Sequence, residues 1–152
     1  MRHLGVWLHL LAVVVWLGGL IFQSHVLFPQ LGKTGGSPLA AAAIRRFRPV
    51  AWSAVVLLVL TGFYNLSRLP SLPLLLQTGA GALLALKVVL LLIALPLAAH
   101  RDFKQAPRLV RALEAGEDPA AMLRGVVWLD RVVLLLGVVA IYLGLAASRG
   151  GL

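Results

Sequence analysis

Residues 80–99 read AGALLALKVVLLLIALPLAA, and this run decides the fold class. It contains a single charged residue, Lys87, among leucine, valine, isoleucine and alanine. A helix that crosses a lipid bilayer needs about 20 consecutive, mostly apolar residues. The segment therefore predicts a membrane-spanning helix that carries one ionisable group.

Three further segments have the length and composition of a membrane span, namely Leu4–Phe28, Val50–Leu66 and Val126–Ala147. Pro29 is expected to end the first helix and Arg48-Pro49 to begin the second, because proline lacks a backbone N–H and suits a first helical turn. The sequence thus predicts an all-α fold. One domain of residues 1–152 forms an integral membrane bundle of four helices.

The composition excludes an ordinary soluble domain. Hydrophobic residues make up 61% of the chain and charged residues 12%, whereas soluble domains are roughly half apolar and a quarter charged. The sequence contains no cysteine, which excludes disulfides, thiolate metal sites and cysteine nucleophiles.

Basic residues mark one side of the predicted bundle. The loops between spans one and two and between spans three and four hold nine of them: Lys33, Arg45, Arg46, Arg48, Arg101, Lys104, Arg108, Arg111 and Arg124. The other side holds only Arg2, Arg68 and Arg149. Basic residues are enriched in cytoplasmic loops, so we expect both termini outside and a short surface helix at Phe103–Leu113 inside. The net charge of +9 then indicates contact with the lipid bilayer, and no nucleic acid as a partner.

Ionisable residues at membrane depth are informative because each is costly unless it is paired or functional. His9 lies five residues into span one and Lys87 seven residues into span three from the same side, a difference in depth of roughly 3 Å. Tyr64 on span two and Tyr142 on span four reach the same level. These four residues predict a polar site in the outer half, unless the Lys87 ammonium extends to the head groups instead.

The first span carries a further pattern around His9. His9 and Trp16 are seven residues apart and share a helix face. Gly18 and Gly19, on the next turn, allow a neighbouring helix or a flat ligand to approach closely. Because a neutral imidazole binds iron, copper and zinc, the pattern indicates either helix packing or a haem or metal site.

A second polar layer is expected near the inner ends of the helices. His25 on span one and His100 on span three lie at similar depth, so the two imidazoles can bind one metal ion, although interfacial histidines are also common without one. Asp130 in span four is expected to pair with Arg131 or with an arginine of the first basic loop.

The string from His9 to Gly19 (HLLAVVVWLGG) resembles the opening helix of the copper resistance protein D (CopD) domain. Arg46-Phe47, the run LLVLTG at residues 57–62, and Leu86-Lys87 resemble the same family. The resemblance covers about Trp7 to Arg101. It implies a multi-pass protein of the bacterial inner membrane that takes part in copper uptake or tolerance.

A second resemblance is to the bacterial four-helix protoporphyrinogen oxidases, which bind haem b. His9, Lys87 and His100 match positions of that family in kind. Trp16-Leu-Gly-Gly departs from the aromatic-rich continuation that the family has on its first helix. The resemblance implies His9 as an axial haem ligand, with Lys87, Trp16, Tyr64 and Tyr142 around the ring.

Three functions follow as hypotheses. The first is copper handling through His9, His25 and His100, although Cu(I) prefers sulfur ligands and the only methionines are Met1 and Met122. The second is a haem b redox protein that passes electrons to a quinone. The third is an assembly role without a cofactor. A homodimer and a periplasmic copper protein are the expected protein partners.

Overall fold

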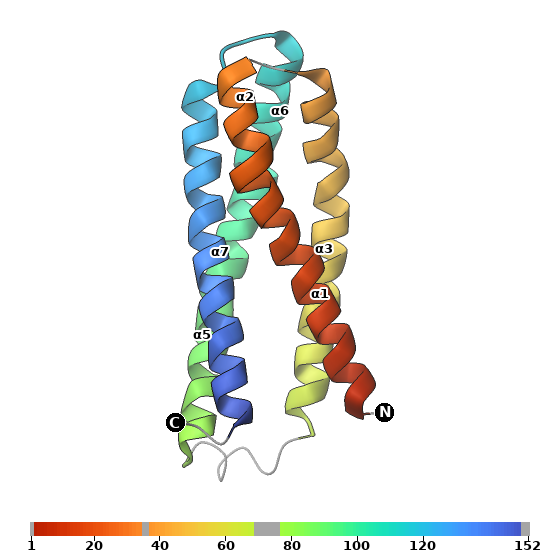
Figure 1. The fold of residues 1–152 in the computed structure, drawn as a ribbon, viewed down its shortest axis with the longest axis vertical. Helices are drawn as coiled ribbons and strands as arrows, with labels where there is room; N and C mark the ends of the chain where they lie inside the picture. Colours follow the sequence, from red (N-terminus) through yellow and green to blue (C-terminus); the bar gives the residue numbers. More distant parts are fainter. Residues whose placement is uncertain (1, 35–36, 69–76, 150–152) are drawn as a thin grey trace.

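The structure is a computed structural model that describes residues 2–34, 37–68 and 77–149. Helices and short turns make up this part of the chain, and it contains no strand. Four helical stretches are long and apolar enough to cross a membrane, which confirms the all-α membrane bundle predicted from the sequence. α1 begins and α7 ends at the same end of the bundle (Figure 1). That the termini face outward remains a prediction.

The first helical stretch passes through the proline that was predicted to end it. α1 (Arg2–Phe22) continues into a π-helical turn, η1 (Gln23–Leu27), and then into α2 (Phe28–Thr34), which contains Pro29. In the π turn the Phe28 N–H donates to the Gln23 carbonyl, one residue further back than in an α-helix. This change of hydrogen-bonding pattern just before Pro29 lets the helix continue past a residue that cannot donate.

The second helix also begins earlier than predicted. α3 spans Pro38–Leu66, so Pro38 takes the first-turn position and Pro49 lies inside the helix. Most of the following connection, with Pro70 and Pro73, lies outside the described residues.

The third helical stretch includes the predicted surface helix. α5 (Gly79–His100) leads through the π-helical turn η2 (Arg101–Gln105) into α6 (Ala106–Ala115). In α6, Leu109 and Leu113 are buried with Phe28 and Ile44 of the neighbouring helices. These two leucines therefore pack on protein, whereas Phe103, at the start of the predicted surface helix, is 58% exposed. That this segment lies at the membrane surface remains a prediction. α7 (Ala120–Ser148) completes the bundle.

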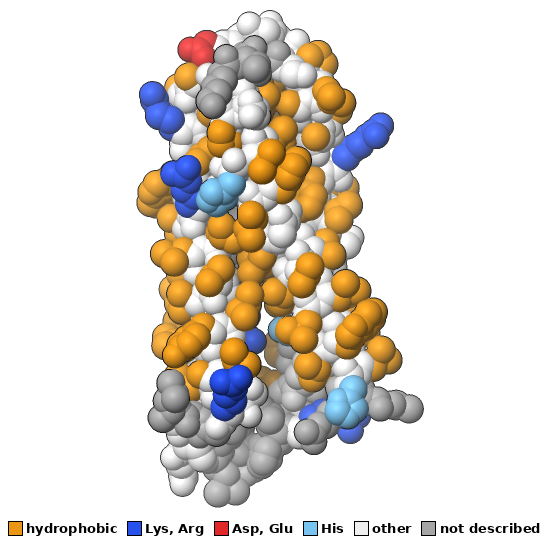
Figure 2. Space-filling view, viewed as in Figure 1, with side chains coloured by type: hydrophobic (Ala, Val, Ile, Leu, Met, Phe, Trp, Pro, Cys, Tyr) orange, Lys and Arg blue, Asp and Glu red, His pale blue; other side chains and the backbone are white. Residues whose placement is uncertain are grey.

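Packing divides the bundle into two pairs, since α1 lies mainly against α3 and α5 mainly against α7. One buried core joins α1 and α3 to Ala98 and Val133, and a second joins α2, the start of α3, α6 and the start of α7. Large apolar side chains cover much of the outer surface, as lipid contact requires (Figure 2).

The helices are longer than a bilayer is thick. The third stretch, Gly79–Ala115, has 37 residues and is roughly 55 Å long, whereas the hydrocarbon core is about 30 Å thick. The basic residues predicted to lie in loops lie mostly on helices, for example Arg45 on α3 and Arg108 on α6.

Candidate functional site

His9 is tied to the neighbouring helix by a threonine. The His9 Nδ1 lies 2.9 Å from Thr61 Oγ1 on α3, in a half-buried setting. Thr61 is itself buried, and its hydroxyl donates to the Leu57 carbonyl at 2.6 Å, one turn back along α3. The sequence pattern did not single out Thr61, because a threonine bonded to its own helix is common and carries no signal of this role.

The direction of these bonds determines which ring nitrogen of His9 is free. The Thr61 hydroxyl is placed to donate to the Leu57 or the Leu58 carbonyl of its own helix, and its oxygen can then accept from a proton on His9 Nδ1. A neutral imidazole with its proton on Nδ1 carries a lone pair on Nε2. In this tautomer Nε2 is the potential ligand atom of His9.

Lys87 and His9 line the same small cavity. The cavity has a volume of about 30 Å³ and is lined by residues of α1, α3, α5 and α7, including Trp16 and Leu58. The Lys87 amine also lies against Gly144 of α7, where an added Cβ would be 2.8 Å from Nζ. A glycine at this position therefore makes room for the lysine head group inside the bundle.

The cavity is the right size for a small group and far too small for a porphyrin. A volume of this order accommodates a water molecule or an ion. Gly19 offers no space for a flat ligand, because the Phe47 ring of α3 covers it. Gly18 is exposed and has no side chain against it. The residues beside His9 therefore do not fit haem b in this arrangement of helices.

The two tyrosines of the predicted outer site lie apart from the cavity. The Tyr64 ring packs against Gly5, and its hydroxyl accepts a bond of 3.1 Å from Arg68. The Tyr142 side chain is 58% exposed and faces away from the bundle interior.

The two inner histidines are both exposed. His25 Nδ1 bonds to the Ile21 carbonyl of its own helix at 3.3 Å. Among the described residues, no group of three or more His, Asp or Glu side chains is placed to hold a metal ion. A shared site of His25 and His100 remains a prediction.

The inner layer instead holds a buried charge network that the sequence pattern did not reveal. Arg101 forms ion pairs of 2.5 Å with Asp102 and 2.6 Å with Asp130, and its guanidinium also donates to Gln23. All four residues are at most 5% exposed. Asp130 was expected to pair with Arg131 or an arginine of the first basic loop, and its partner is Arg101.

This charge network joins all four helical stretches. Gln23 begins η1, Arg101 and Asp102 begin η2, and Asp130 lies on α7. The fourth contribution comes from α3, where Trp52 Nε1 donates to Asp102 at 2.9 Å. Both π-helical turns thus begin at a member of the network. Two features of the sequence could have indicated this network: the adjacent pair Arg101-Asp102 at the end of the third span, and the single acidic residue Asp130 in the fourth.

Comparison with known proteins identifies a family for the chain. The family model described as "Copper resistance protein D" (CopD) matches residues 41–148. No curated protein and no solved structure matches the chain.

Proposed function

This chain belongs to the copper resistance protein D family, and from that membership we propose that it binds copper inside the membrane through Nε2 of His9. Copper is then the substrate of the protein, which takes part in copper uptake or in copper tolerance. A periplasmic copper protein is the expected donor at the end of the bundle where the termini lie.

The observation that carries this proposal is the bond between His9 and Thr61. Metal-binding histidines usually donate their other ring N–H to an oxygen, which fixes the tautomer and the ring orientation. His9 has this second contact at Nδ1 and borders a cavity of about 30 Å³. His25 lacks comparable support, because its bond runs to its own helix and its side chain is exposed.

The ligand set also limits how strongly one chain holds copper. Imidazole suits copper, yet Cu(I) favours sulfur, and the chain has no cysteine. Lys87 is the other potential nitrogen donor at the cavity. We therefore expect a weak, exchangeable site, which suits transfer better than storage.

A copper titration of the purified protein tests the proposal. In competition with a coloured Cu(I) chelator, the wild type should bind about one copper per chain, and His9→Ala should bind at least about tenfold more weakly. The control is His3→Ala, which removes an exposed histidine of α1 that does not line the cavity and should leave binding unchanged. Equal binding by wild type and His9→Ala would overturn the role of His9, and a Soret band in the wild type would favour haem.

Thr61→Val should weaken copper binding by roughly 10- to 100-fold, the range typical for loss of a contact that orients a metal ligand. The valine has nearly the same shape but accepts no hydrogen bond, so the His9 ring loses its fixed tautomer. Thr61→Ser keeps the hydroxyl and should retain most of the affinity. The same chelator competition measures both variants, and wild-type affinity in Thr61→Val would contradict the tautomer argument.

A further inference from the structure

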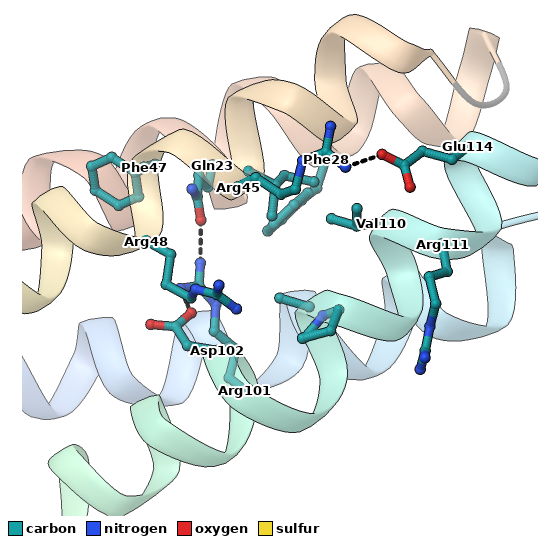
Figure 3. A pocket seen from close by; sticks show the side chains of 13 residues that line it. Gln23, Phe28, Arg45, Phe47, Arg48, Arg101, Asp102, Val110, Arg111 and Glu114 are labelled. Carbon is teal, nitrogen blue, oxygen red and sulfur yellow. Dashed lines mark hydrogen bonds and ion pairs between the residues drawn. The ribbon is translucent and has the colours of Figure 1, made fainter.

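A second, larger cavity lies in the basic half of the bundle. It has a volume of about 280 Å³ and lies between α3 and the stretch formed by η2 and α6 (Figure 3). One part of its wall is apolar, with Phe28, Phe47 and Val110 among its residues. The remaining wall carries four arginines, Arg45, Arg48, Arg101 and Arg111.

The charges at this cavity do not balance. Two carboxylates, Asp102 and Glu114, line it against the four arginines. Glu114 pairs with Arg45, and Asp102 pairs with Arg101. Arg48 and Arg111 form no ion pair with any residue in the described ranges. Arg48 instead lies over the Phe103 ring, 5.8 Å from its centre. Arg101 is shared with Asp130 as well, and the Arg111 side chain extends away from α3 and the cavity (Figure 3), so Arg48 is the arginine of this wall that is left for an anion.

The cavity lies at the level of lipid head groups. Arg101 directly follows the 22 residues of α5, which rise roughly 33 Å from the other end of the span. The hydrocarbon core is about 30 Å thick, so Arg101 marks its boundary. Phe103, two residues further on, is 58% exposed and is available to acyl chains.

We propose that this cavity binds the phosphate head group of an anionic phospholipid. The planar guanidinium group of Arg48 matches phosphate oxygens, and the apolar wall accommodates the glycerol and the start of the acyl chains. Basic pockets between membrane helices are suited to such head groups. This inference does not depend on copper binding at His9, which lies in the other half of the bundle.

The test measures lipid binding to the purified protein by native mass spectrometry. Phosphatidylglycerol should bind the wild type, and Arg48→Gln should bind it roughly tenfold more weakly or worse. The matched control is Arg46→Gln, which removes the same charge from the same helix at an exposed residue outside the cavity lining. The control should bind like the wild type, and thermal melting should be similar for all three proteins.

Three outcomes would overturn the proposal. Equal weakening in the control would show that only general surface charge attracts the lipid. Equal binding of phosphatidylcholine would show that the lipid's net negative charge is not recognised. Binding of glycerol phosphate as tightly as of phosphatidylglycerol would assign the cavity to a soluble phosphate ester and not to a lipid.

Discussion

Replacing Arg101 by methionine should destabilise the protein by about 3–5 kcal/mol, the usual cost of removing one partner from a buried ion pair. Arg101 is 4% exposed and is the cation that pairs with both Asp102 and Asp130. Without it, Asp130 keeps no ion pair in the described part of the chain, and Gln23 loses its donor. Unfolding by a denaturing detergent, followed by tryptophan fluorescence, measures the change.

Two further variants test whether the loss of stability comes from the buried ion pairs of Arg101. Arg111→Met removes an exposed arginine without an ion pair from the same helical stretch and should change stability by less than about 0.5 kcal/mol. Arg101→Met/Asp130→Leu removes the opposing charge as well and should be more stable than Arg101→Met alone. An Arg101→Met protein as stable as the wild type would show that the network contributes little to folding.

Replacement by alanine should have different effects on stability at the two adjacent glycines of α1. Gly19→Ala should destabilise by about 1–3 kcal/mol, because the Phe47 ring occupies the position of the new methyl group and must move away. Gly18→Ala should be neutral or stabilise by up to about 1 kcal/mol, since nothing lies within 4 Å of its added Cβ and alanine favours a helix.

Thermal melting of the two single variants in one detergent provides the comparison, with each serving as the control for the other. A similar loss of stability in both would mean that α1 does not pack on Phe47 as described. Gly19→Ala/Phe47→Ala should lose less stability than the sum of its two single changes, because the smaller side chain makes room for the new methyl group.

The two halves of the bundle have separate properties, and Figure 3 shows the cavity of one of them. The half with the termini has a small cavity bordered by His9 and Lys87. The other half has a buried charge network and a larger basic cavity. We expect His9 variants to change copper binding with little effect on lipid binding, and Arg48 variants to do the reverse.

The sequence alone determined the number of spans, the membrane setting and the family. A bilayer supplies no hydrogen-bond partners, so each span must satisfy its backbone within one long apolar helix, and such a helix is visible as a local run of residues. Equal depth of His9 and Lys87 was likewise predictable, because the rise per residue of a helix is constant. Helix ends were less predictable, since π-helical turns and packing of α6 carried the helices past their expected limits.

Only the tertiary structure decided which polar groups meet. The partner of Asp130, the threonine behind His9 and the different surroundings of Gly18 and Gly19 all depend on how each helix is rotated about its axis. That rotation comes from side-chain packing between helices far apart in the chain, for which a periodic apolar pattern gives no information when the whole helix is apolar. Residue types were enough to predict an apolar surface toward the lipid, but they could not predict which side chains contact one another in the interior.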